Sequence, residues 1–229
     1  MYLSKMDLNM ARLETLRLVG SPYRMHALVE HAFPPHIART CEQGRILWRV
    51  DASPTKDAAV LCILSPERPD LIHAVEQAGW PLYPHWETKD YRPLLDKIAK
   101  GQVWQFRLKA NPVRTVLVDK GRRENQKVIG TVQGHVTEAH QRQWLLDRSG
   151  SHGFRVLGSK GDAPDVSVSH RSRERFLRDG KTVTLVTAQF DGILEVTDAV
   201  AFKHALGFGI GRAKGFGCGL LTIAPACSE

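Results

Sequence analysis

The sequence predicts an α+β fold built from two tandem βαββαβ units, residues 1–100 and 101–229. Short apolar runs typical of strands alternate with amphipathic segments typical of helices. This cycle stops at a proline-rich stretch, 80–86, and starts again near residue 101. The halves also differ in charge, with 13 Lys and Arg against 12 Asp and Glu in the first and 19 against 12 in the second.

The first unit opens with a strand and a helix. Ser21 is a suitable N-cap for this helix, Pro22 fits its first turn because no hydrogen bond is lost there, and Pro34 and Pro35 end it. The expected elements, in order, are a strand at 2–9, a helix at 21–33, paired strands at 45–50 and 58–64, and a helix at 66–78.

The second unit repeats the cycle. Gly150 closes its first helix, and the dipeptide Asp191-Gly192 is a hairpin signal between two apolar strands. The expected elements are a strand at 102–110, a helix at 137–150, strands at 182–190 and 192–197, a helix at 198–206 and a strand at 218–224. Two units of this kind make the ferredoxin-like arrangement.

Composition limits the class of protein. The chain has 229 residues, of which 42% are hydrophobic and 24% charged, as in ordinary globular proteins. No apolar run reaches the roughly 20 residues of a membrane-spanning helix, and "MYLSKMDLNMARLE" lacks the apolar core of a secretory signal. A cytoplasmic location without membrane contact is therefore expected. The four cysteines are scattered without a CxxC pair, which argues against a zinc site and a disulfide framework.

The charge suggests a polyanionic partner, since the net charge is +8 and the isoelectric point is near 9.5. In "FRLKA", the cations Arg107 and Lys109 alternate with apolar residues, so one strand face is basic. A solvated edge explains Arg107 equally well from the pattern alone. In "SHRSRERFLRDGK" the eight residues 171–178 hold the cations Arg171, Arg173, Arg175 and Arg178, with only Glu174 opposing them. The second half is therefore the expected binding half.

The stretch "GIGRAKGFGCGLLTI" is the densest in glycine, and six of the nineteen glycines fall between Gly207 and Gly219. It follows a helix and precedes a strand, the reverse of a phosphate-binding P-loop, and its GxGxxxG spacing does not fit a dinucleotide fingerprint. No nucleotide cofactor is expected. Two interpretations stay open: a flexible connector, or a packed loop whose amides, with Arg212 and Lys214, face a phosphate backbone.

The helix at 21–33 has an apolar stripe that should face the core: Met25, Leu28, Val29 and Ala32. On another flank Tyr23, His26 and Glu30 lie close together at 100° per residue. A phenol, an imidazole and a carboxylate at the rim of a core helix could form an acid–base site, although a surface histidine alone is a weak signal.

Several segments together carry a family resemblance. They are "MYLSK", "YRMHALVEHAF", "FRLKANPVRT", "QRQWLLDRSGSHGF" and "GIGRAKGFGCGLLTIAP", the last in the form GhGxxxGhG, where h is apolar. In this ordered set the sequence resembles the CasE family of type I-E CRISPR systems, the endoribonuclease that processes CRISPR precursor RNA. Residues 40–100 match the family poorly.

The resemblance implies two ferredoxin-like domains and one cut in the repeat RNA, 3′ of its stem-loop, without metal or cofactor. It implies 2′,3′-cyclic phosphate and 5′-hydroxyl ends, and continued binding to the hairpin beside the other Cascade subunits. The family's catalytic histidine corresponds to His26 and its phenol to Tyr23, whereas His31 matches a histidine that is not catalytic. Lys214 is a candidate for an assisting lysine.

Which proton His26 moves is left open, and two other functions are weighed. A non-catalytic RNA-recognition module should show an aromatic run that is missing here, and a structural Cascade subunit should lack the pair formed by Tyr23 and His26. Cleavage of a repeat hairpin would decide. The residues expected to bind RNA are Lys109, Arg114, Lys160, Arg171, Arg173, Arg175, Gly209, Gly211, Arg212, Lys214, Gly215 and Gly217.

Overall fold

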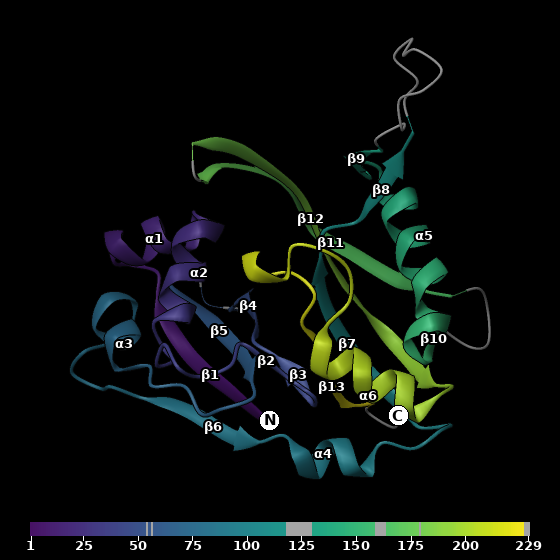
Figure 1. The fold of residues 1–229 in the computed structure, drawn as a ribbon, viewed down its shortest axis with the longest axis horizontal. Helices are drawn as coiled ribbons and strands as arrows, with labels where there is room; N and C mark the ends of the chain where they lie inside the picture. Colours follow the sequence, from purple (N-terminus) through teal and green to yellow (C-terminus); the bar gives the residue numbers. More distant parts are fainter. Residues whose placement is uncertain (54, 56, 118–129, 159–163, 179, 227–229) are drawn as a thin grey trace.

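The computed structural model describes residues 1–226 apart from 54, 56, 118–129, 159–163 and 179 (Figure 1). Its fold is mixed α+β, as the sequence predicts. Two antiparallel sheets, one from each half of the chain, carry helices on their outer sides. No helix in the described part of the chain is long and apolar enough to cross a bilayer.

The first sheet has the strand order β4-β5-β1-β6, in which Met6 of β1 lies opposite Leu61 and Trp86. Helix α1 and strand β6 were not predicted, and the predicted helices at 21–33 and 66–78 are shorter in the structure. The elements of this half are β1 (Tyr2–Asn9), α1 (Leu13–Val19), α2 (Pro22–Glu30), β2 (Thr40–Cys41), β3 (Gly44–Arg45), β4 (Leu47–Ala52), β5 (Ala58–Ser65), α3 (Ile72–Ala78), β6 (Trp86–Asp90) and α4 (Arg92–Lys97).

The second sheet has the order β10-β12-β7-β13, and β11 also pairs with β12. In both sheets the first strand lies between the third and the fourth of the four principal strands. The elements are β7 (Val103–Ala110), β8 (Val113–Val116), β9 (Thr131–Gly134), α5 (Glu138–Ser149), η1 (Gly150–His152), β10 (Phe154–Leu157), β11 (Val166–Arg178), β12 (Lys181–Val196), α6 (Ala199–Phe208), η3 (Lys214–Phe216) and β13 (Leu221–Pro225).

The predicted hairpin at Asp191-Gly192 is wrong. Strand β12 runs through both residues without a turn, because Asp191 pairs with Arg107 of β7 and Gly192 with Phe106. The Phe106 ring packs so closely that a Cβ on Gly192 would lie 3.1 Å from it. The second principal strand of this half is therefore the short β10. Pairing of β12 with β7 has overridden the local turn signal at Asp191-Gly192.

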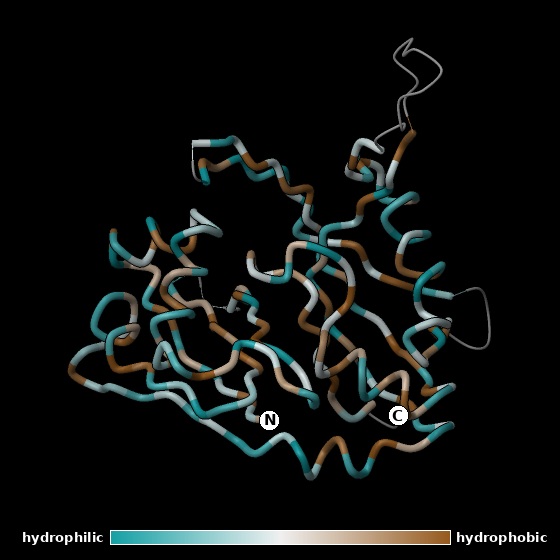
Figure 2. The backbone as a smooth tube through the Cα atoms, viewed as in Figure 1, coloured by the Kyte–Doolittle hydropathy of each residue, from teal (hydrophilic) through white to brown (hydrophobic). Residues whose placement is uncertain are grey.

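The arginine-rich segment lies in a long hairpin. Strand β11 pairs with β12 from Val166 to Arg178, and Gly180, with φ of +72°, lies at the turn. We call residues 172–178 and 181–187 the hairpin arm. In Figure 1 the arm extends away from the second sheet on the side where α1 and α2 lie, and it carries both hydrophilic and hydrophobic residues in Figure 2.

Two hydrophobic cores hold the fold together. One lies between the first sheet and its helices, with Met25, Leu28 and Val29 of α2 among its members. The other joins the two halves, since Leu47 and Leu64 of the first sheet belong to the same buried cluster as many side chains of the second. The relative position of the two sheets is thus set by burial of apolar surface.

A buried guanidinium also joins the halves. Arg49 of β4 pairs with Asp51, with Nε 2.6 Å from Oδ1, and its side chain is 3% exposed. From the same group Nη1 donates to the backbone oxygens of Arg107 and Leu220 at 3.0 and 2.9 Å, and Nη2 donates to Thr222 Oγ1 at 2.9 Å. Its hydrogen bonds therefore connect the first sheet with β7 and β13 of the second.

Candidate active site and nucleic-acid interface

His26 is held in place by the anchored face of α2. The helix begins as predicted, with the Ser21 hydroxyl accepting from the backbone N–H of Arg24 and with Pro22 in the first turn. Met25 and Val29 are buried on one side. His26 is left on the flank that faces η3 and the hairpin arm, both of which contact α2.

The imidazole of His26 lies against the glycine-rich loop. Its ring is 5.9 Å from the ring of Phe216, with the planes inclined by 68°. A Cβ built on Gly215 would be 3.6 Å from Cε1 of His26, so any side chain at this position would contact the imidazole. The carbonyl of Gly215 accepts from Trp48 Nε1 at 3.2 Å, which ties the loop to β4.

Phe216 connects the histidine to the hairpin arm. The ring of Phe176 packs edge-on against it at 4.9 Å, and the guanidinium carbon of Arg178 lies 5.6 Å from the centre of the ring. The site thus combines a helix, a loop and an arm that are far apart in sequence. The sequence analysis did not assign Phe216, Phe176 or Arg178 to this site. Phe216 lies in the glycine-rich stretch, and Phe176 and Arg178 lie in the arginine-rich one, so their positions next to these two motifs were the available signal.

Burial lowers the pKa of His26 below its usual value of 6.5, Glu30 opposes this and Arg178 adds to it. The carboxylate of Glu30 lies between His26 and Arg39: Oε1 is 3.9 Å from His26 Nδ1, and Oε2 accepts from Arg39 Nε at 2.6 Å. A histidine with a lowered pKa is mainly neutral at pH 7, the form in which it can accept a proton.

Lys214 lies in the same loop, and its pKa is lowered by burial and by Arg45. Tyr23 lies one turn before His26 on the same side of α2, and the residue is 42% exposed. His31 faces α3, where its ring lies 6.3 Å from that of His73. The structure therefore separates the two histidines of the helix.

The glycine-rich stretch is a packed loop and not a flexible connector. Gly209, Gly211 and Gly217 have φ values of +74°, +83° and +75°. A Cβ on each would lie 3.0 Å or less from Gly219 O, Trp144 or Trp48, respectively. Packing alone therefore requires these three glycines, and Gly215 is the one whose Cβ position faces His26.

The predicted RNA-binding cations are spread over several surfaces. Lys109 pairs with Glu174 at 3.8 Å, and Arg171 donates to Gln141 and to the carbonyl of Val136. Strand alternation puts Glu174, Phe176 and Arg178 on one face of the arm and Arg173 and Arg175 on the other. Arg114 and Arg212 are exposed on β8 and in the loop. Lys160 lies outside the described residues.

A cavity of about 440 Å³ opens between the halves, next to the histidine. Phe216 and Met25 contribute to one wall, and Lys109, Glu174 and Gln189 to the other. In the described residues, no group of three or more His, Cys, Asp and Glu side chains is arranged to hold a metal ion.

The comparisons with known proteins agree over the whole chain. The family model described as "CRISPR associated protein" matches residues 1–225. "CRISPR-associated endoribonuclease Cse3" of Thermus thermophilus is 30% identical, and "CRISPR system Cascade subunit CasE" of Escherichia coli 29%; each match covers 98% of this chain and 100% of the relative. The structure of the Thermus Cse3 bound to an RNA "representing a pre-cleavage complex" has a TM-score of 0.76, with 27% identity and 98% of both chains covered.

Proposed function

The chain belongs to the family of CRISPR-associated proteins, and we propose that it is an endoribonuclease of CRISPR precursor RNA. It binds the stem-loop of the repeat, cuts once on the 3′ side and stays bound to the mature RNA as a Cascade subunit. The full-length matches to an endoribonuclease and to a Cascade subunit support this proposal. So does the likeness to a structure that holds a pre-cleavage RNA.

The observation that carries the chemistry is the half-buried imidazole of His26, which lies against the Phe216 ring of the glycine-rich loop with Arg178 nearby. RNA carries its own nucleophile, so the enzyme has to align the 2′-oxygen, phosphorus and the leaving 5′-oxygen and to move protons. His26 takes the proton of the 2′-hydroxyl as the 2′-O–P bond forms. The P–O5′ bond breaks and the 5′-oxygen takes a proton from water, which leaves a 2′,3′-cyclic phosphate and a 5′-hydroxyl.

The lowered pKa of His26 favours the role of general base over that of general acid. A group of this kind contributes on the order of 10²–10⁴-fold to the rate. Tyr23 is assigned to hydrogen bonding with the phosphate or the ribose. Arg178 offsets the negative charge of the phosphate, and Glu30 positions His26 and Arg39 without touching the substrate.

RNA binding is assigned mainly to the second half. A-form RNA presents phosphates along a deep, narrow groove, and cations on an extended hairpin can follow them. The proposed contacts are Lys109, Arg114, Lys160, Arg171, Arg173, Arg175, Arg212 and Lys214, with the backbone of the loop at Gly209, Gly211, Gly215 and Gly217. We also propose two ferredoxin-like domains, 1–100 and 101–229, which the matching strand orders support. A cytoplasmic location remains a prediction.

The decisive experiment uses a synthetic repeat hairpin with a single deoxyribose at the nucleotide before the cut. We expect the all-ribose RNA to be cut in excess EDTA and the deoxy RNA to bind equally tightly but stay intact. Cutting of the deoxy RNA would exclude attack by the 2′-hydroxyl. A protein that binds both RNAs and cuts neither would be a non-catalytic subunit.

A further inference from the structure

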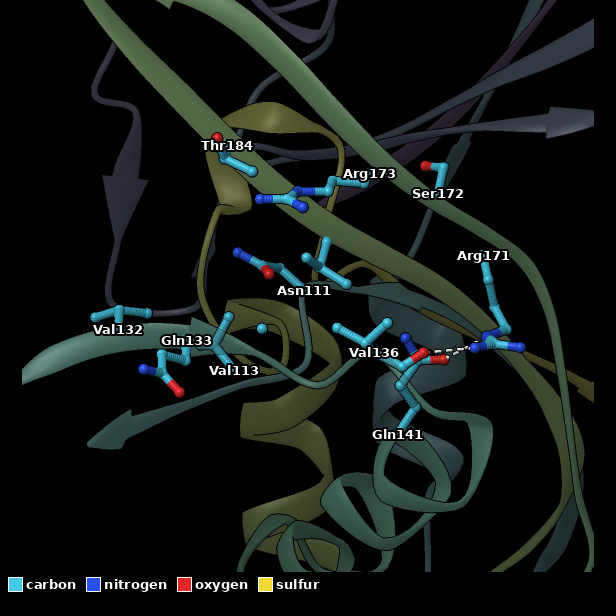
Figure 3. Close-up of a pocket in the computed structure, with 12 residues that line it drawn as sticks. Asn111, Val113, Val132, Gln133, Val136, Gln141, Arg171, Ser172, Arg173 and Thr184 are labelled. Carbon is cyan, nitrogen blue, oxygen red and sulfur yellow. Dashed lines mark hydrogen bonds between the residues drawn. The ribbon is translucent and has the colours of Figure 1, made fainter.

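A second cavity, of about 720 Å³, lies on the other side of the hairpin arm (Figure 3). Strands β8 and β9 form one side, the start of α5 another, and the base of the arm the third. Arg173 lines this cavity, whereas Arg178 lies beside Phe216. The two arginines are five positions apart along the strand, about 17 Å. The cavity is therefore distinct from the site at His26.

The side-chain oxygen of Asn111 is the buried polar atom of this cavity that lacks a hydrogen bond. The residue is 7% exposed, and its Oδ1 has no hydrogen-bond partner. Figure 3 shows its amide in the middle of the pocket. Its backbone is held by a bridge to Arg212 and by the proline that follows it. Because buried polar atoms are nearly always hydrogen bonded, this oxygen indicates a ligand that donates an N–H or O–H.

Arg173 supplies the complementary donors. In the part of the chain that the structure describes, its guanidinium has no ion pair or hydrogen bond, and Figure 3 shows it directed over the pocket. Arg171 differs, because its guanidinium is held by Gln141 and by the carbonyl of Val136. Arg171 thus forms part of the wall, and Arg173 is available to a ligand.

The rest of the lining mixes apolar and polar side chains. The apolar ones are Val113, Val132, Val136 and Val186, and the polar ones are Gln133, Ser172 and Thr184. Gly134 closes the pocket beside Val186, since a Cβ there would lie 2.5 Å from that side chain. A pocket that combines apolar side chains with a few placed polar groups is typical of a small-molecule site, and the volume is within the usual range. An unpaired acceptor and a forked donor beside apolar side chains suit a nucleobase, whose edge carries donors and acceptors.

We propose that this pocket binds one unpaired nucleotide of the RNA, outside the stem and different from the nucleotide that is cut. The base donates an N–H to Asn111 Oδ1, and Arg173 contacts the acceptor edge of the base or its phosphate. The inference rests on the proposed function, because it takes repeat RNA as the ligand. It adds a recognition point that reads the sequence next to the hairpin.

The test compares a bare stem-loop with a stem-loop that keeps its unpaired flanks, by binding to catalytically inactive protein. Val132 is 46% exposed at the pocket, so Val132→Trp can fill it with little strain on the core. Val200→Trp, at an 80% exposed position on α6, is the matched control. Asn111→Ala removes the acceptor, and circular dichroism checks its fold.

We expect the flanks to strengthen binding by about 5- to 150-fold, the range for one recognised base. Val132→Trp and Asn111→Ala lose this gain and bind the bare stem-loop as the parent does, while Val200→Trp keeps it. The bases of the flanks are then removed one at a time. Removal of one particular base should abolish the added affinity in the parent protein and should have no further effect on binding by Val132→Trp.

The inference is overturned if Val132→Trp retains the full gain, or if no single abasic position is coupled to Asn111. The proposed function is tested separately. If the active protein neither binds nor cuts a repeat hairpin that includes the linkage 3′ of the stem, the function itself fails. If it cuts this hairpin but the further unpaired flanks add nothing to binding, only the pocket assignment fails.

Discussion

The ring of His26 lies edge-on to the ring of Phe216, at 5.9 Å and with the planes inclined by 68°. One residue comes from the second helix of the chain and the other from a loop before its last strand. The contact exists only because the two halves share a hydrophobic core. The candidate active site is therefore a product of the docking of the halves, and its catalysis should depend on both.

His26→Ala should abolish cleavage of a repeat hairpin, since the proton acceptor is lost, and leave hairpin affinity within a few-fold. A rate loss on the order of 10²–10⁴ is expected in single-turnover assays. His31→Ala is the matched control, because its ring faces His73 and not the loop. Normal cutting by His26→Ala would remove this residue from the mechanism.

The pH dependence should report the buried imidazole. A general base works only when deprotonated, so kcat/KM should rise with pH and level off above the pKa of His26, which burial lowers below 6.5. Glu30→Gln removes the charge that raises this pKa, so the rising limb should move to lower pH. The assignment of His26 as base would be contradicted if the rising limb of kcat/KM stays at the same pH in Glu30→Gln. It would also be contradicted if kcat/KM falls as the pH rises through the pKa of His26.

The two faces of the hairpin arm should act differently. Arg178→Gln should slow cleavage of bound RNA, because this side chain lies over Phe216 beside His26. Arg175→Gln, on the opposite face, should weaken RNA binding and reduce by about one the slope of the logarithm of the binding constant against the logarithm of the salt concentration. The single-turnover rate at saturating protein should not change. Equal effects of both variants on cleavage would show that the faces are not distinguished by the RNA.

Removal of the buried cation between the sheets should destabilise the fold. Arg49→Ala leaves Asp51 without its partner and removes the hydrogen bonds to the backbone oxygens of Arg107 and Leu220 and to Thr222 Oγ1, and a loss of about 3–5 kcal/mol is expected. Arg155→Ala breaks an ion pair with Glu195 whose arginine is 64% exposed, and should cost less than about 1 kcal/mol. Urea unfolding followed by circular dichroism measures both, and similar midpoints would contradict the role given to Arg49.

The differences between expectation and structure share one cause. Asp191-Gly192 is a strong turn signal in isolation, but pairing with β7 keeps both residues in a strand. Strand β11 is rich in arginine and poor in apolar residues, so nothing in its own sequence marks 13 residues as extended. It is a strand because β12 pairs with it. In both cases the partner strand decided the structure, and not the segment's own sequence.

The sequence by itself determined the α+β class, the helix that carries His26, its capping by Ser21 and the excess of positive charge in the second half. These follow from the order of side chains along a few turns or strands, which is local information. The tertiary structure alone decided that Phe216, Gly215 and Arg178 meet His26, that the arm has two different faces, and that Asn111 is buried without a partner. Such relations depend on which surfaces bury one another when distant segments pack, and no short stretch of sequence specifies that.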